Sequence, residues 1–116
     1  MGENRIKLVA ADMDGTLLNR ERKITKYTQN VIKKAMAQGV YFVPATGRAV
    51  NALPPELKEM EGIRYGIFSN GATIYDLKEE KVIYKNHFEM DRVLELMDFL
   101  KQFELMESIS LNGQAY

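Results

Sequence analysis

The pattern of apolar and polar residues predicts alternating strands and helices in the first part of the chain. Short apolar runs at 7–11 and 40–44 are typical of strands buried on both faces of a parallel sheet. Between these runs, Tyr27, Val31, Ala35 and Met36 fall on one face of a helix expected over 26–38. Thr25 suits the start of this helix and Gly39 suits its end.

The next segments continue this alternation. A second helix is expected over 49–60, with Pro54 and Pro55 at its start or in a kink. A third short strand is expected in the stretch 65–72, which ends in Asn70-Gly71. The order strand, helix, strand, helix, strand predicts an α/β fold, a Rossmann-like parallel sheet with crossover helices.

The pattern changes in the last part of the chain. Alternating runs at 72–76 and 81–85 predict a β-hairpin, and the apolar stripe from Met90 to Phe103 predicts a helix over 90–104 with that stripe in the core. A strand at 106–111 then precedes Asn112-Gly113, a strong hairpin-turn signal. Only three residues follow this turn, which suggests a chain that stops within a domain.

Composition narrows the class of protein. The chain has 116 residues, a formal net charge of zero and no cysteine, and 46% of its residues are hydrophobic. These values indicate one soluble globular domain without the basic surface of a nucleic-acid binder and without disulfides. Because no stretch reaches the ~20 apolar residues of a membrane span, we expect no membrane partner and a cytoplasmic location.

Polar side chains and glycines gather where the predicted strands end. Asp12 and Asp14 follow the first strand, Thr46-Gly47-Arg48 follow the second, and Ser69-Asn70-Gly71 follow the third. In an open parallel sheet, ligands bind in the crevice beyond the carboxyl ends of the strands. The sequence therefore predicts one site built from these three strand ends.

The residue types at this predicted site suit phosphate chemistry. Two close carboxylates repel each other unless a cation or a proton intervenes, and hard oxygen ligands favour Mg²⁺. One carboxylate can act as a nucleophile while the other acts as general acid and base. Gly15, Thr46 and Gly47 can direct backbone N–H groups at an anion, and Arg48 offers a planar fork for phosphate oxygens.

Simpler interpretations remain open at this stage. Thr46 and Gly47 would also suit a plain turn before a helix, and Arg48 would also suit an ion pair with a surface acid such as Glu56. Asn70-Gly71 would also suit a backbone turn that shapes the site without touching substrate. The only histidine, His87, is expected to be a surface or hinge residue.

The three motifs together resemble a known family. "DMDGTLL" is similar to the first motif of the haloacid dehalogenase (HAD) superfamily of phosphotransferases. "ATGR" and "SNGATIYD" are similar to later motifs of its Cof-type phosphatase branch. The resemblance implies that residues 1–86 are the first part of a HAD core and that 87–116 begin an inserted α/β cap, here truncated.

The resemblance also implies roles for individual residues. Asp12 would be the nucleophile and a Mg²⁺ ligand, and Asp14 would be the general acid and base and offer its backbone carbonyl to the metal. Thr46 would hold the transferring phosphoryl group, and Arg48 would contact the substrate. The implied activity is hydrolysis of a small phosphorylated metabolite, such as a sugar phosphate, through an aspartyl-phosphate. The candidate phosphate- or substrate-binding residues are Thr46, Gly47, Arg48, Asn70 and Gly71.

Two further hypotheses are kept beside this one. The family's later lysine and acidic metal motifs are absent from these residues, so the isolated chain is expected to be inactive or impaired. It would then be a truncated or split product that serves as a binding or assembly module, with its unpaired cap strand open to pairing between copies. A receiver-type phospho-acceptor domain would need another strand-end acid and a later lysine, and neither is apparent.

Overall fold

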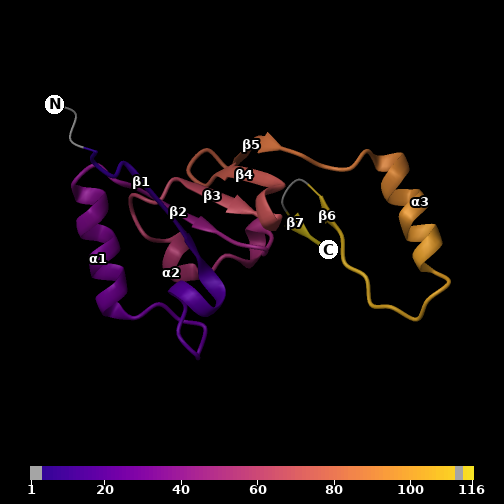
Figure 1. Ribbon diagram of the computed structural model, residues 1–116, viewed down its shortest axis with the longest axis horizontal. Coiled ribbons are helices and arrows are strands. Elements are labelled where there is room, and N and C mark those ends of the chain that lie inside the picture. The colour runs from indigo at the N-terminus through magenta and orange to yellow at the C-terminus, as the bar shows by residue number, and fades with distance from the viewer. Residues whose placement is uncertain (1–3, 112–113) are drawn as a thin grey trace.

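The computed structural model describes residues 4–111 and 114–116. Within these residues, one mixed sheet has the strand order β1-β2-β3-β4-β5 (Figure 1). β1 (Leu8–Asp12), β2 (Tyr41–Ala45) and β3 (Tyr65–Phe68) run parallel, whereas β4 (Thr73–Asp76) and β5 (Lys81–Lys85) form an antiparallel hairpin that extends the sheet. The predicted α/β fold and the predicted hairpin are therefore confirmed.

The first two helices cover one face of the sheet. α1 (Lys26–Ala37) begins at Thr25, whose side chain accepts a hydrogen bond from the Thr28 amide, as the capping pattern predicted. One buried cluster joins Ile32 of α1 and Leu57 of the second helix to Phe68 of β3. Both helices therefore pack on the same side of the sheet, against the same core.

The second predicted helix is shorter and broken. The structure replaces the expected helix over 49–60 with a single turn, η2 (Val50–Ala52), and a short helix, α2 (Pro55–Lys58). Leu53 and Pro54 between them are extended, because a residue that precedes proline is sterically driven out of the helical region. Pro55 stands at the first turn of α2, where its missing N–H is tolerated.

β1 differs from its prediction, because it is not buried on both faces. Leu8 and Val9 are 55% and 39% exposed. Among the described residues, β1 pairs only with β2 and is thus an edge strand, so its apolar side chains lack the cover that a central strand would have. The prediction of burial on both faces is wrong for these described ranges.

The prediction that the stripe from Met90 to Phe103 lies in the core is also wrong. α3 (Met90–Leu100) has the expected helical spacing but no buried residue, and Leu94 and Phe103 are 57% and 51% exposed. In Figure 1, α3 stands apart from the sheet, so its apolar side chains have no core to enter.

The last elements form a small hairpin. β6 (Ser110–Leu111) pairs antiparallel with β7 (Gln114–Ala115), and β7 lies against η2 (Figure 1). The predicted turn at Asn112-Gly113 lies outside the described residues. In the part of the chain that the structure describes, no helix has both the length and the apolar composition that crossing a membrane requires.

Candidate active site

The register of the sheet brings the three parallel strand ends to one edge. Asp12 pairs with Ala45 across β1 and β2, and Ala45 pairs with Ile67 across β2 and β3. The segments that follow these positions therefore leave the sheet at the same level, as the strand order predicted.

The first strand end exposes both aspartates. β1 runs into a wide helical turn, η1 (Met13–Leu17), in which Met13 is fully buried. Asp12 and Asp14 lie on either side of Met13, and both are exposed. A carboxylate oxygen of Asp12 accepts a hydrogen bond from the Met13 amide at 2.8 Å. Gly15 has φ of +78°, which allows the sharp turn that directly follows the acids.

The second strand end is built around a buried threonine. Thr46 is 6% exposed, and its backbone N–H donates to the Ile67 carbonyl at 2.9 Å. Its hydroxyl oxygen accepts the Arg48 amide at 3.0 Å, which closes a tight turn over Gly47. The simpler interpretation of 46–48 as a turn is therefore correct for the backbone, and the turn directs Arg48 along the same sheet edge.

A bidentate ion pair links the first two strand ends. Arg48 Nε lies 2.9 Å from one carboxylate oxygen of Asp14, and Nη2 lies 2.6 Å from the other. The remaining guanidinium nitrogen, Nη1, donates to the Ala52 carbonyl at 3.2 Å. Arg48 therefore does pair with an exposed acid, but that acid is Asp14 and not Glu56, because the turn at 46–48 directs the guanidinium to Asp14. No sequence pattern indicated this pairing.

The ion pair favours the charged form of Asp14. The hydrogen bonds from Arg48 lower the pKa of Asp14, and partial burial opposes this effect only in part. The charges of Arg48 and Arg22 lower the pKa further. Asp14 is therefore a carboxylate in this arrangement, although a general acid must carry a proton. Arg22 was not among the sequence candidates.

The third strand end is joined to the second by backbone hydrogen bonds. The Ser69 amide donates to the Arg48 carbonyl at 2.9 Å, and the Asn70 amide donates to the Thr46 carbonyl at 3.1 Å. Gly71 completes the turn η3 (Ser69–Gly71). Direct contacts thus connect Asp14, Arg48, Thr46 and Asn70, while Asp12 shares their edge through its register with Ala45.

His87 lies on the segment that leaves β5. It is exposed, as predicted, and its Nε2 atom is 2.9 Å from the hydroxyl of Thr73, which is 1% exposed. The neighbouring Asn86 amide donates to the Ala72 carbonyl. These bonds tie the start of the following segment to β4, beside η3 but outside the contacts of the candidate site.

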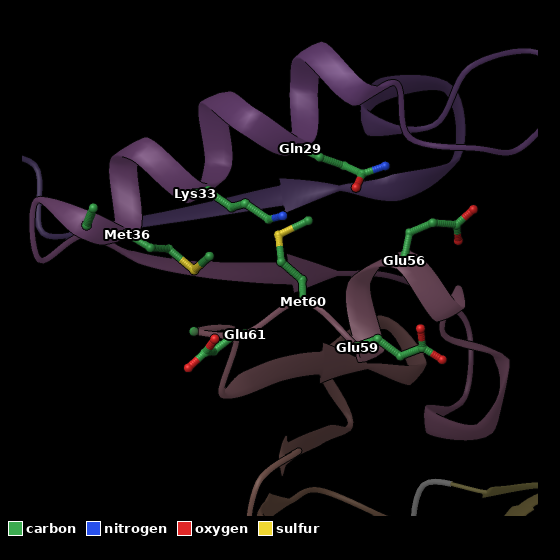
Figure 2. A pocket seen from close by; sticks show the side chains of 9 residues that line it. Gln29, Lys33, Met36, Glu56, Glu59, Met60 and Glu61 are labelled. Atoms are coloured by element: carbon green, nitrogen blue, oxygen red, sulfur yellow. The ribbon is translucent and has the colours of Figure 1, made fainter.

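A separate hollow lies between α1 and the turn after α2. It has a volume of about 750 Å³, and Figure 2 shows Lys33 and Met36 on one side and Glu59, Met60 and Glu61 on the other. No predicted site residue lines it. The candidate chemistry therefore belongs to the exposed strand-end edge and not to this hollow.

The oxygen atoms at the strand-end edge suit a hard cation only in part. Across residues 4–111 and 114–116, no three acidic or histidine side chains gather closely enough to hold a metal. Asp12 offers a carboxylate, while the Asp14 carboxylate is engaged by Arg48. Mg²⁺ often takes one or two protein oxygens and completes its shell with water and substrate phosphate, so this donor set has the right chemistry.

A family model for haloacid dehalogenase-like hydrolases matches residues 9–116. This match covers nearly the whole described fold, including all three strand ends. The chain belongs to this family, and the resemblance inferred from the motifs is confirmed.

Relatives extend the likeness. The chain is 37% identical over 89 residues to a Bacillus subtilis protein named 5-amino-6-(5-phospho-D-ribitylamino)uracil phosphatase YcsE; this covers 73% of the chain and 36% of that protein. A solved HAD subclass IIB sugar phosphatase is 33% identical, with a TM-score of 0.67 over 83% of this chain and 37% of that one. A structure from Plasmodium vivax, described as a HAD/Cof-like hydrolase, is 29% identical, with a TM-score of 0.67 over 84% and 36%. The chain thus spans little more than a third of each of these relatives.

Proposed function

We propose that this protein is a Mg²⁺-dependent phosphohydrolase that acts on a small phosphorylated metabolite, such as a sugar phosphate. The observation that carries the proposal is the placement of Asp12 and Asp14 on either side of the buried Met13 at the end of β1. Arg48, from the end of the next strand, is bound to Asp14. The family and the phosphatase names of the relatives support the same class of reaction.

The proposed reaction uses the two aspartates in turn. A carboxylate oxygen of Asp12 attacks phosphorus, and the bond from phosphorus to the substrate oxygen breaks, which leaves an aspartyl-phosphate. Asp14 gives a proton to the departing oxygen. Asp14 then removes a proton from water, and the water oxygen attacks phosphorus. The bond from phosphorus to the Asp12 oxygen breaks, which releases inorganic phosphate and regenerates the Asp12 carboxylate. The Thr46 hydroxyl donates to an oxygen of the transferring phosphoryl group.

Arg48 has two anionic partners in this scheme. In the present arrangement its fork holds Asp14 ionised, and an ionised Asp14 has no proton to give. Phosphate oxygens have the spacing to accept the same fork. The substrate phosphoryl group therefore competes for Arg48. Release of Asp14 removes the hydrogen bonds that lower its pKa, and the nearby phosphoryl anion raises that pKa, so Asp14 takes up the proton that it later gives from solvent.

Magnesium would be held by the Asp12 carboxylate and the Asp14 backbone carbonyl. A bound Mg²⁺ neutralises charge on the phosphoryl group. Residues 87–116 would begin a cap domain, and the exposed side chains of α3 are consistent with a surface that further chain covers. The alternative of a non-catalytic binding module has no specific observation in its favour, since a phosphatase family accounts for the motifs.

The test is Asp12→Asn in the protein at its natural full length. Wild type should release p-nitrophenol from p-nitrophenyl phosphate in the presence of Mg²⁺, and chelation should abolish this activity. The variant should lose at least about a thousandfold in kcat, because an amide is a poor nucleophile. Full activity in Asp12→Asn, with an unchanged melting temperature, would contradict the assignment.

A further inference from the structure

The turn after β3 has an unusual backbone. Ser69, Asn70 and Gly71 have φ values of +50°, +55° and +92°, so three successive residues lie on the left-handed side of φ. Glycine adopts such angles freely and asparagine tolerates them, whereas serine is disfavoured there. A strained run persists only when surrounding contacts hold it, and such runs cluster at functional sites.

The contacts that hold the run come from the second strand end. Ser69 donates its amide to the Arg48 carbonyl, and Asn70 donates its amide to the Thr46 carbonyl. These two carbonyls lie on either side of Gly47, so the turn is hydrogen-bonded to both ends of the 46–48 segment. The φ of Asn70 sets the direction in which the chain leaves this hydrogen bond, so a residue that avoids the left-handed region would displace the turn from Thr46.

Gly47 is held closely from the same side. A methyl group added at Gly47 would lie 2.8 Å from Oδ1 of Asn70 and 3.4 Å from its Cγ and Nδ2. A side chain at 47 therefore fits only if the Asn70 carboxamide moves away. The Asn70 side chain thus packs on the turn that carries Thr46 and Arg48, and only glycine at 47 allows this approach.

We propose that Ser69–Gly71 is the positioning element of the Thr46–Arg48 segment, and that Asn70 acts through its left-handed backbone and not by touching substrate. This inference rests on the proposed phosphohydrolase function. The two hydrogen bonds from Ser69 and Asn70 fix the Thr46 and Arg48 carbonyls. Through these carbonyls they set the direction in which the Arg48 side chain extends from the sheet edge. Asn70 is then a positioning residue for Arg48 and, through Arg48, for Asp14.

Two substitutions at position 70 separate backbone from side chain. In the full-length protein, Asn70→Gly removes the carboxamide but keeps the left-handed angle accessible, whereas Asn70→Ala removes both. Asn70→Ala should lower kcat on p-nitrophenyl phosphate on the order of tenfold or more, since small misplacements of catalytic groups have large effects. Asn70→Gly should lose several-fold less kcat than Asn70→Ala, because glycine adopts the left-handed angle freely. Equal losses in both variants, with raised KM, would mean that the carboxamide binds substrate and would overturn the inference.

A second pair of variants tests the contact at Gly47. Gly47→Ala should lower kcat, because its methyl group displaces the Asn70 carboxamide and pushes on the turn. The double variant Gly47→Ala/Asn70→Gly should be more active than Gly47→Ala alone, since the obstructing side chain is absent. A double variant that is no better than Gly47→Ala would contradict the packing. Melting temperatures are measured for every variant, so that a loss of fold is recognised as such.

A readout that does not depend on activity separates this inference from the proposed function. The Arg48 Nε–H signal in a ¹⁵N NMR spectrum reports the hydrogen bond to Asp14. It should move toward the free-arginine position in Asn70→Ala and remain in place in Asn70→Gly. If wild type proves inactive, the proposed function fails, yet this signal still decides whether the turn positions Arg48. An unchanged signal in Asn70→Ala would refute the positioning role.

Discussion

Two aspartate–arginine pairs stand at opposite ends of β3, and they differ in how tightly each is held. Asp14 and Arg48 meet beyond the carboxyl ends of the parallel strands, where their side chains are 54% and 26% exposed. Asp76 and Arg64 meet at the other end, where Arg64 precedes β3 and Asp76 ends β4. The Asp76 side chain is only 3% exposed.

Backbone hydrogen bonds hold Asp76 in the pair with Arg64. One Asp76 oxygen accepts the amides of Lys78 and Glu79, at 3.0 and 2.9 Å, and the other accepts two nitrogens of Arg64 at 3.1 Å. Among the described residues, Asp14 accepts hydrogen bonds from Arg48 and from no backbone amide. A carboxylate that is held by two backbone amides besides its arginine is part of the scaffold, whereas one held only by a guanidinium can exchange its partner. The same residue types therefore serve structure at one end and, on our proposal, chemistry at the other.

The largest expected effect is a contrast between Asp14→Asn and Asp76→Asn. Asp14→Asn should reduce kcat by about a hundredfold or more, because an amide cannot give a proton to the leaving oxygen, while the melting temperature changes little. Asp76→Asn should lower the melting temperature by several degrees and leave kcat close to wild type, because it places an amide N–H₂ against the Arg64 donors. Phosphatase assays and thermal melts on both variants check this. An exchange of the two outcomes would reverse the assignment of the pairs.

A smaller effect is expected from replacing each arginine by lysine. Arg48→Lys keeps a positive charge but loses the fork, so kcat/KM should fall about tenfold. The pKa of Asp14 should also rise, because the Arg48 hydrogen bonds are what chiefly lower it. The basic limb of the kcat/KM profile against pH should then move to higher pH, since Asp14 stays protonated longer. Arg64→Lys is the matched control and should leave the profile unmoved; a shift there would indicate that global stability governs the profile.

The sequence predicted most of the residues 4–86 correctly for a physical reason. Apolar residues of this stretch pack on one another, as Ile32, Leu57 and Phe68 do. The face predicted for the first helix was nevertheless wrong in part, because Tyr27 and Val31 are 79% and 48% exposed and Ile32 is buried in their place. The sequence also predicted that Asp12 and Asp14 lie at the end of the first strand, where the structure has them. Local pattern is sufficient where the partner of each apolar face is encoded nearby.

Features that depend on long-range geometry were not predicted. The amphipathic pattern of α3 gave the helix but not its exposure, since a stripe specifies that a face is apolar and not what covers it. The Asp14–Arg48 pair joins residues 34 positions apart through two turns, and no composition signal reports the direction of a guanidinium. The left-handed angle of Ser69 likewise results from hydrogen bonds to Arg48 and is not a preference of serine.

The smallest expected effect is a pH dependence of stability that separates the two pairs. Burial alone would raise the pKa of Asp76, but the Glu79 amide, the Arg64 guanidinium and the Lys78 amide together lower it below its ordinary value of 3.8. Its contribution to the free energy of unfolding is therefore complete above that value and is lost as the pH falls through the lower, folded-state pKa. The advantage of wild type over Asp76→Asn in urea unfolding should shrink over this acidic range.

Asp14 also has a lowered pKa, so its contribution has the same sign and the same acidic window. Salt distinguishes the two, because a Debye length of about 3 Å in 1 M salt screens an exposed ion pair but not amide donors packed on a buried carboxylate. The wild-type advantage over Asp14→Asn should vanish in 1 M NaCl, whereas the advantage over Asp76→Asn should largely remain. Equal sensitivity to salt would mean that both carboxylates rely on their arginines alone, and the distinction between a locked and an exchangeable pair would fail.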